Sequence, residues 1–433
     1  MKTTSEDIRQ TFLDYFTEHG HLSIPGLSLV PENDPTLLVI NSGMAPLKPY
    51  FTGEKTPPAR RLCNIQKCVR TNDIDQVGDE HHLTFFEMMG NWSIGDYFKD
   101  EAINLAWKLI SDVFGFDASK IYVTVFGGDD KLHGIPQDDE SKEIWGRLVP
   151  SERIIPLGAE CNFWGPTSDT GPCGPCTEIF IDRGVLGCKR PYCGPSCSCG
   201  RFVEIWNAGV FMEYYLHDDK SLTKLPMKSV DAGAGLDRFA FILQGVNSVY
   251  ETDLLSPIVD TVIAGSNLDN ESKSARIMSD HIRCATFMIG DGVYPANTRR
   301  EYVLRRILRR AILHANLSGI PYNRLVSASM VAIKLSGGNY PELLNLESTI
   351  RTVVETEIKV FGKTLHRGLK ELQKVIARSQ QTISGEDAFR LHDTLGLPLE
   401  LTRDVAEKNG LAVNSSDYHH LLEQQRERSR SKK

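Results

Sequence analysis

At residues 231–238 the chain reads Asp-Ala-Gly-Ala-Gly-Leu-Asp-Arg. The alternating glycines carry no side chain, so a ligand can come close to the backbone, and Arg238 at the end supplies a fixed positive charge. The stretch lacks the G-x-G-x-x-G spacing of a dinucleotide-binding loop, and no Gly-Lys-Ser/Thr follows it as in a P-loop. It therefore indicates a nucleotide site of another kind.

The sequence pattern changes just after this stretch. Before it, short β-rich runs such as residues 121–125 alternate with Gly/Pro turns and helical segments. After it, long segments such as residues 275–289 and 348–379 have the 3.6-residue period of helices. We therefore expect an α+β domain over residues 1–248 and an all-helical domain over residues 249–433.

The composition limits where the protein acts and what it binds. The chain has 433 residues, 41% of them hydrophobic, and a formal net charge of −7. No apolar run approaches the roughly 18 residues of a membrane span. Residues 1–16 lack the apolar core of a signal peptide, and Thr4 with Asp7 predicts a capping box that starts a helix. We expect a cytoplasmic protein without a membrane partner, in which any nucleic-acid contact comes from a local basic face.

A single arginine marks a second block. Arg70 follows Cys68 and Val69, precedes a polar turn at residues 71–73, and is followed by an apolar run at residues 85–89. An arginine at a strand end can hold a carboxylate or a phosphate through two hydrogen bonds from its planar guanidinium. Taken alone, such a residue is more commonly a solvated loop arginine, so the assignment needs a second motif.

Together, the two blocks resemble the signature motifs of class II aminoacyl-tRNA synthetases. The second motif of that class has an arginine, a loop, and an arginine or histidine followed four residues later by phenylalanine; here these are Arg70, His81 and Phe85. The third motif ends in G-x-G-Leu-acid-Arg, which residues 233–238 supply. The resemblance implies an antiparallel β-sheet flanked by helices, followed by an all-α tRNA-recognition domain.

The resemblance narrows to alanyl-tRNA synthetases and extends over nearly the whole chain. It is carried by residues 29–38, 41–44, 84–92, 95–99, 171–178, 204–207, 280–281, 291–293, 302–307 and 389–394. It implies an alanine-tRNA ligase that activates alanine with ATP and Mg²⁺ and transfers it to the 3′ end of tRNA(Ala). Catalysis of this kind is mostly positioning and charge stabilisation, so arginines and a divalent ion matter more than a side-chain nucleophile.

The resemblance also implies roles at the ATP site. Arg70 would hold the alanine carboxylate and the α-phosphate, and His81 and Arg238 would hold the outer phosphates. Phe85 would stack on adenine, and Gly235 would lie against the nucleotide.

The remaining roles concern the amino acid and the metal ion. Asp231 would pair with the alanine ammonium, so Arg70, Arg238 and Asp231 are the expected catalytic residues. Glu204 would be a ligand of Mg²⁺. The walls of the small alanine pocket would be Met88, Trp164, Asn207, Val210 and Gly233. Without the resemblance, Met88 and Trp164 would be taken for ordinary core residues.

The sequence departs from the family pattern in three places. Residues 70–73 stand where the family commonly has a Gly-Gly-Lys-His insertion, so contacts made there must be missing or replaced. Residues 207–210 are one residue longer than the common form, which affects the position of Val210. His81 stands where an arginine usually contacts phosphate, and a histidine is only partly charged near neutral pH.

Four cysteines lie close together in an insert at about residues 186–200, namely Cys188, Cys193, Cys197 and Cys199. The segment is rich in Gly and Pro, whose turns let close ligands converge, and four thiolates suit a tetrahedral zinc ion. We expect a structural zinc site, with reduced free thiols or disulfides as the alternatives. The C-x₄-C-x₃-C-x-C spacing is not that of a standard zinc finger.

An arginine-rich segment lies in the helical half. Its cations are Arg299, Arg300, Arg305, Arg306, Arg309 and Arg310. They either follow the phosphates of the tRNA acceptor stem or form a solvated surface face. By resemblance, Asn297 and Asp393 take the positions that read a G·U pair of that stem through its wide minor groove.

Longer members of the family continue into an editing domain and a C-terminal tRNA-binding region, and this sequence ends before both. A pocket separates alanine from glycine by one methyl group, worth about 1–3 kcal/mol. We therefore expect mischarging with serine or glycine unless a separate editing factor acts in trans. Two other functions stay open: an amino-acid:carrier-protein ligase, and a non-catalytic paralogue that binds tRNA.

Overall fold

The computed structural model describes residues 3–32, 37–129, 134–166, 169–184, 188, 190 and 193–430, with side chains to residue 425. Residues 33–36 of the first family motif region and residues 186, 187, 189, 191 and 192 of the cysteine-rich insert lie outside the described residues.

The chain divides into two compact units. The first, which we call the sheet unit, contains residues 1–71 and 80–256, and the second, the helical unit, contains residues 72–79 and 257–433. The sequence pattern placed the change near residue 248. The structure places it after Ser256 and adds the short segment 72–79 to the helical unit.

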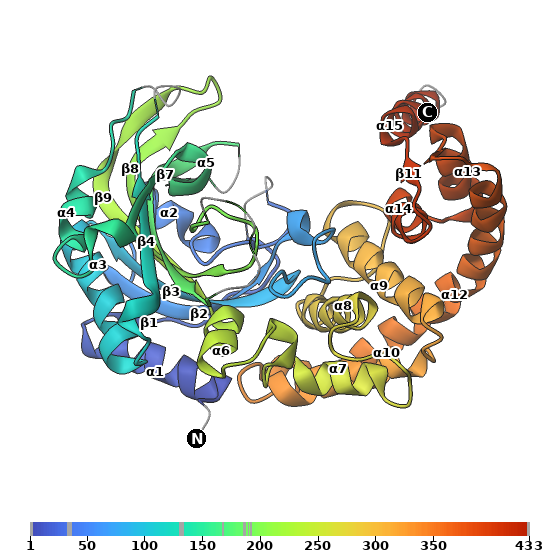
Figure 1. The fold of residues 1–433 in the computed structure, drawn as a ribbon, viewed down its shortest axis with the longest axis horizontal. Helices are drawn as coiled ribbons and strands as arrows, with labels where there is room; N and C mark the ends of the chain where they lie inside the picture. The colour runs from blue at the N-terminus through green and yellow to red at the C-terminus, as the bar shows by residue number, and fades with distance from the viewer. Residues whose placement is uncertain are drawn as a thin grey trace. The chain divides into compact units, whose positions relative to one another are not determined.

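The sheet unit is built on one nine-stranded sheet (Figure 1). Its strands are β1 (Leu22–Ser23), β2 (Arg61–Val69), β3 (Phe85–Ile94), β4 (Ile121–Phe126), β5 (Ile154–Leu157), β6 (Phe163–Trp164), β7 (Gly171–Asp182), β8 (Phe202–Leu216) and β9 (Leu222–Gly235). Their order is β1-β2-β3-β9-β8-β7-β4-β5, and β6 pairs with β7. Only the β1–β2 and β4–β5 pairs among these described strands are parallel. The expected α+β fold with an antiparallel-dominated sheet is confirmed.

Helices α1 (Ser5–Glu18) and α6 (Leu236–Leu243) cover one face of this sheet, and Phe51 of α2 (Lys48–Phe51) packs in a cluster with Trp92 on the other. The α-helices of the unit are α1 (Ser5–Glu18), α2 (Lys48–Phe51), α3 (Lys99–Lys108), α4 (Asp139–Trp145), α5 (Ala159–Asn162) and α6 (Leu236–Leu243). Phe12 of α1 and Phe239 of α6 both pack on the ring of Trp206 in β8, each with ring centroids 6.0 Å apart. Arg9 of α1 donates two hydrogen bonds, of 3.0 and 2.6 Å, to the buried carboxylate of Glu87 in β3. The face of the sheet that carries Trp206 and Glu87 is therefore buried under α1 and α6.

The helical unit contains the rest of the helices. They are α7 (Ser256–Ile263), α8 (Lys273–Gly290), α9 (Arg299–Leu317), α10 (Asn323–Ser336), α11 (Pro341–Asn345), α12 (Glu347–Arg378), α13 (Gly385–Leu395), α14 (Leu399–Lys408) and α15 (Ser415–Arg430). The two-residue strands β10 (Thr382–Ile383) and β11 (Ala412–Val413) pair in parallel. Across the described residues, every helix is too short or too polar to cross a membrane. The helical character expected for the second half is confirmed.

Candidate active site on the open face of the sheet

Strand register brings the glycine-rich stretch beside β3. Met88 lies opposite Gly235, Gly90 opposite Gly233, and Trp92 opposite Asp231. Since successive side chains of a strand point to opposite faces, Met88, Trp92 and Asp231 share the face that α1 and α6 leave uncovered. The two sequence blocks that suggested a nucleotide site are therefore neighbours in the sheet.

A bulge in β8 adjusts the other side of the site. Asn207 pairs with Gly233, but the next pair on this strand is Val210 with Asp231, so three steps along β8 match two along β9. One extra residue in a strand is the definition of a β-bulge. The bulge absorbs the additional residue noted at positions 207–210 and sets Val210 opposite Asp231.

The floor of the site is a methionine packed against glycines. The Gly43 N–H lies 3.1 Å from Met88 Sδ. A Cβ added at Gly233 would come within 2.9 Å of the same sulfur. A larger residue at Gly233 would therefore have to displace the methionine side chain.

Asp231 is a buried carboxylate without a cation. Its Oδ1 accepts a hydrogen bond of 2.7 Å from the indole Nε1 of Trp92. Burial raises the pKa of Asp231 to about 7, and the Trp92 hydrogen bond opposes the rise. In the described part of the chain no lysine or arginine pairs with this carboxylate. A buried carboxylate of this kind is stabilised by a positively charged ligand.

Asn207 adds a second acceptor. Its Nδ2 donates to Glu178 Oε1 at 3.3 Å, while its Oδ1 is buried and has no hydrogen-bond partner among the described residues. Asn41 Oδ1 and Ser42 Oγ, from the segment that precedes Gly43, are also buried without a partner. Buried polar groups are usually paired, and unpaired ones cost about 1–3 kcal/mol each. These orphaned atoms indicate the place of a ligand.

Trp164 and Val210 lie in one hydrophobic cluster beside Asp231. Val210 is 2% exposed and packs in a cluster with Trp92, and the half-buried Trp164 of β6 packs against it. Both residues therefore pack as core residues do and also form one wall of the candidate site.

Arg70 directly follows β2. Its backbone N–H donates to Thr84 O at 2.9 Å, and its Nε donates to Asn41 O at 3.4 Å. The guanidinium lies 4.9 Å from the centroid of the Phe86 ring. Among the described residues no carboxylate pairs with Arg70, so its planar fork can bind an anionic ligand.

The expected adenine contact of Phe85 is not supported. Phe85 is fully buried and, by strand alternation, lies on the face opposite Met88. Phe86 is half-buried on the face of Met88 and carries the Arg70 guanidinium over its ring. His81 lies shortly before β3, with its ring centroid 4.5 Å from that of His82.

Arg238 and two glutamates form the far end of the site. Arg238, in the first turn of α6, donates to Glu204 Oε2 at 2.9 Å and to Glu204 O at 3.2 Å. Burial and then the Glu204 charge raise the pKa of Glu178 well above its ordinary value, and Arg238 opposes the rise. Two carboxyl groups that repel each other in this way supply the oxygen ligands that Mg²⁺ prefers.

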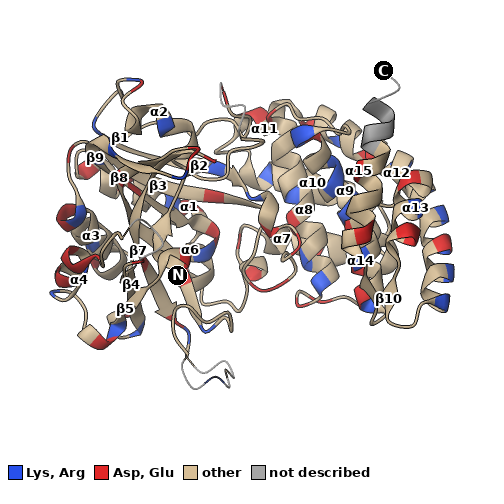
Figure 2. Cartoon of the chain, turned by 90° about the horizontal axis from the view of Figure 1, so that it is seen from above, with Lys and Arg blue, Asp and Glu red and all other residues tan. Residues whose placement is uncertain are grey.

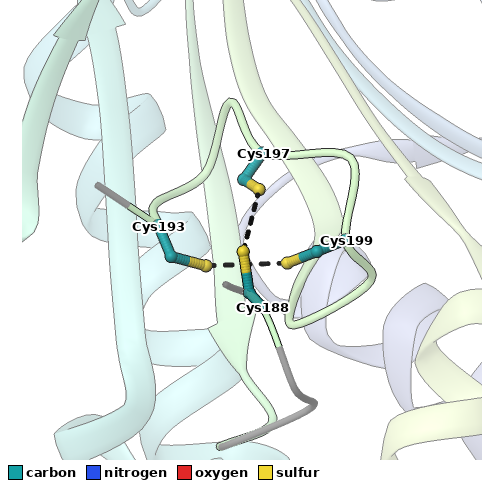
Figure 3. A group of neighbouring side chains, drawn as sticks. All are labelled: Cys188, Cys193, Cys197 and Cys199. Carbon is teal, nitrogen blue, oxygen red and sulfur yellow. Dashed lines mark hydrogen bonds between the residues drawn. The ribbon is translucent and has the colours of Figure 1, made fainter. Parts of the chain in front are cut away.

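The cysteine insert brings its four sulfurs together, as Figure 3 shows. All four lie within 4.8 Å of one another. Cys188 and Cys197 have sulfurs 3.7 Å apart, and Cys193 and Cys199 have sulfurs 3.5 Å apart. A tetrahedral zinc ion with Zn–S bonds of about 2.3 Å requires sulfurs about 3.8 Å apart. The thiols are free in the structure, and their separation suits a metal ion better than a disulfide.

The arginines of α9 are more internally paired than expected. Figure 2 shows basic positions along α9 and acidic positions on α12 and α14. Arg309 pairs with Glu357 at 2.8 Å, and Arg305 bonds Asn297 Oδ1 and Pro295 O. These side chains act in part as structural ties of the helical unit.

Arg310 is buried, so it does not fit the role in tRNA binding that was expected of it. It is 1% exposed, pairs with Asp404 at 2.8 Å and donates to the carbonyl of Ile74. Its guanidinium is therefore committed inside the helical unit, because position 310 falls on the apolar side of α9. Arg299, at a positive φ of 52°, is exposed at the start of the helix. Asp393 is exposed and bonded to Gln425.

Sequence reasoning missed Trp92, Glu178 and Phe86. Each lies in a stretch that the family resemblance already covers, namely residues 84–92 and 171–178. The period-two alternation of a strand starting at residue 85 would have separated Phe86, Met88 and Trp92 from Phe85 and Glu87. Glu178 depends on the pairing of β7 with β8, which the sequence does not reveal.

Comparisons with known proteins identify the family of the chain. A family model described as tRNA synthetases class II (A) matches residues 7–433. The alanine-tRNA ligase of Acetivibrio thermocellus is 43% identical over 96% of this chain and 48% of its own length. That of Natranaerobius thermophilus is 44% identical over 98% of this chain and 49% of its own length. The chain thus spans about half the length of the curated relatives it matches.

A solved structure gives a more distant match. The histidyl-tRNA synthetase of S. aureus is 11% identical and matches 57% of this chain and 69% of its own, with a TM-score of 0.33. The assignment rests on the sequence family rather than on this likeness. Since the family model covers nearly all of the sequence, the chain belongs to the class II (A) family of tRNA synthetases.

Proposed function

We propose that the chain activates alanine with ATP and transfers it to the 3′ end of tRNA(Ala). The observation that carries the proposal is the buried Asp231 carboxylate, which lacks a cation and lies beside the unpaired Asn207 Oδ1. Both would accept hydrogen bonds from the ammonium of an amino acid. Met88 packed against Gly233 forms the floor on which the small side chain of the amino acid would lie. The names of the relatives, alanine-tRNA ligases, support alanine as that amino acid.

In the first step, a carboxylate oxygen of alanine attacks the α-phosphorus of ATP, and pyrophosphate leaves. Arg70 makes no ion pair with a carboxylate of the described residues and would hold both the alanine carboxylate and the α-phosphate, which reduces their repulsion. Asp231 would fix the ammonium and so orient the carboxylate. The side chains would position the two reactants and stabilise the charge that develops, and no covalent bond to the protein is needed.

The outer phosphates would meet His81 and Arg238. Phe86, rather than Phe85, would stack on adenine, because it lies on the same face as Met88. Glu204 and Glu178 would hold Mg²⁺, which neutralises phosphate charge when bound. Their mutual repulsion in the free protein is the reason that a divalent cation fits there.

In the second step, a ribose hydroxyl at the tRNA 3′ end attacks the alanyl carbonyl, and AMP leaves. Asn297 and Asp393 would read the G·U pair, and Arg299, Arg305, Arg306 and Arg309 would contact the backbone. Charging of tRNA transcripts with the G·U pair intact or replaced tests this step. Exchange of pyrophosphate without charging would favour the carrier-protein ligase, and the absence of both would favour the paralogue.

We also propose that Cys188, Cys193, Cys197 and Cys199 hold a structural zinc ion. The sulfur separations support it, since they approach those of a ZnS₄ tetrahedron. Elemental analysis of the purified chain should give about one zinc per chain, and a Cys197→Ser variant should give much less. A metal-free chain with four titratable thiols in the insert would contradict the site.

The size of the proposed alanine pocket affects how accurately the amino acid is selected. A methyl-sized space excludes larger side chains but separates glycine by only about 1–3 kcal/mol, and serine differs by a hydroxyl. We propose that the chain by itself mischarges tRNA with glycine or serine, that a separate factor acts in trans, and that the reaction takes place in the cytoplasm. Hydrolysis of seryl-tRNA(Ala) by this chain alone would contradict the first point.

A further inference from the structure

Residues 72–79 connect Arg70 to His81 along the chain but belong to the helical unit. Ile74 and Val77 are fully buried. The carbonyl of Ile74 accepts a hydrogen bond from Arg310, and that of Gly78 accepts one of 3.5 Å from Arg276. The segment is therefore held by backbone and apolar contacts, to which the side chain of Asp75 adds two ion pairs.

Asp75 bridges two arginines from different helices. Its Oδ1 accepts a hydrogen bond of 2.8 Å from Arg306 Nη2 in α9, and its Oδ2 accepts one of 2.9 Å from Arg403 Nη2 in α14. Arg306 Nε is buried and makes no hydrogen bond, and Glu400 Oε1, its ion-pair partner, lies 3.9 Å away. The two guanidinium groups thus form a fork that holds one anion and retains an unused donor.

The anion in the fork is weakly held. The side chain of Asp75 is 51% exposed and that of Arg403 is 38% exposed. Ion pairs of this exposure are worth about 0–1 kcal/mol, and an RNA phosphate carries the same charge and binds arginine through two hydrogen bonds. The Arg309–Glu357 pair differs, because the Glu357 side chain is only 7% exposed. Arg306 and Arg403 are therefore the pair from which an incoming phosphate can displace a carboxylate.

We propose that Arg306 and Arg403 form a binding site for an RNA backbone phosphate, which the Asp75 carboxylate occupies in the RNA-free protein. When RNA binds, it releases Asp75 and loosens segment 72–79, whose two ends continue into Arg70 and His81. The identity of the RNA as tRNA(Ala) rests on the proposed function, whereas the phosphate site itself does not.

The first test is binding of a tRNA(Ala) transcript to the full chain over a range of salt. Asp75→Asn removes the competing anion and should tighten binding about threefold to tenfold, while Asp75→Glu restores wild-type affinity. Arg306→Gln and Arg403→Gln should each weaken binding and lower the slope of log K against log salt by about 1. Glu347→Gln is the matched control, since it frees Arg351 from an exposed pair of 3.4 Å on α12 and should change little.

Kinetics and hydrogen exchange distinguish this role from a structural one. In charging assays, Asp75→Asn should lower the KM for tRNA and leave the KM for ATP and alanine as in the wild type. Amide exchange within residues 72–79 should rise when tRNA binds the wild type. Unchanged RNA affinity in Asp75→Asn, or an effect confined to the KM for ATP, would overturn the proposal. If the wild type makes no alanyl-adenylate, the proposed function fails, but binding and exchange still decide the phosphate site.

Discussion

The indole of Trp92 donates a 2.7 Å hydrogen bond to Asp231, and these two residues face each other across β3 and β9. The bond fixes one oxygen of a buried carboxylate that has no positive partner among the described side chains. This arrangement determines how the site responds to pH and to substitution.

Alanine activation should depend on the ionisation of Asp231. Its pKa is raised to about 7 by burial, so the carboxylate that pairs with the ammonium is present mainly above that pH. The kcat/KM for alanine, measured by pyrophosphate exchange, should therefore rise as pH rises through about 7. Asp231→Asn should remove this step and lower kcat/KM by about 100-fold or more, as expected for loss of a buried charge partner. A pH step that persists in Asp231→Asn would assign it to another group.

The same group affects the stability of the ligand-free protein. Its folded pKa, about 7, lies above the ordinary value of 3.8, so the unfolded chain releases the proton first. The contribution of Asp231 is fully present below about pH 4 and is lost as pH rises through 7. Asp231→Asn should show no such loss in urea unfolding. An identical pH dependence of the two proteins would contradict the burial of this carboxyl.

The close packing of Gly233 on Met88 predicts a specific effect on the amino-acid pocket. A methyl group in Gly233→Ala would lie 2.9 Å from Met88 Sδ, and overpacking of this kind costs about 1–3 kcal/mol. The KM for alanine should rise more than the KM for ATP. Gly235→Ala is the comparison, because its added methyl meets nothing closer than 3.9 Å. Equal effects of the two changes on the alanine KM would refute the packing argument.

Substitution of Phe86 should affect ATP binding, whereas substitution of Phe85 should affect stability. Loss of a stacked ring in Phe86→Ala should raise the KM for ATP by about tenfold, since a base stacked on an aromatic ring is worth about 1–3 kcal/mol. Phe85→Leu, in the buried face, should mainly lower the urea midpoint. If Phe85→Leu raised the KM for ATP and Phe86→Ala did not, Phe85 would be the residue that stacks on adenine, as the family resemblance implies.

Arg310 should act in stability rather than in RNA binding. Arg310→Gln leaves the Asp404 carboxylate without its arginine, with only His314 3.6 Å away, and should cost about 3–5 kcal/mol of unfolding free energy. Arg351→Gln, which breaks an exposed pair, should cost no more than about 1 kcal/mol. Comparable unfolding midpoints for the two variants would show that the Arg310–Asp404 pair does not stabilise the unit.

Local features of the fold were accessible from the sequence. The Thr4–Asp7 capping box depends on residues three apart and is present at the start of α1. The long segments of helical period correspond to α8, α9 and α12. The prediction that Arg70 and residues 233–238 belong to one site came from the family resemblance and not from local signals.

Features set by tertiary pairing were not accessible. Which arginine of α9 is buried depends on Asp404, which lies 94 residues away. The place of residues 72–79 in the helical unit depends on partners such as Arg403, more than 300 residues away. The neighbourhood of Glu178 and Glu204 follows from strand pairing. No spacing within the sequence encodes these contacts.

The most direct measurement is ATP–pyrophosphate exchange by the wild-type chain with alanine, glycine, serine and valine in turn. Exchange should be fastest with alanine, slower with glycine and serine, and absent with valine, as expected of a pocket whose floor is closed by Met88 and Gly233. Exchange that is independent of the amino acid, or faster with valine than with alanine, would contradict this expectation.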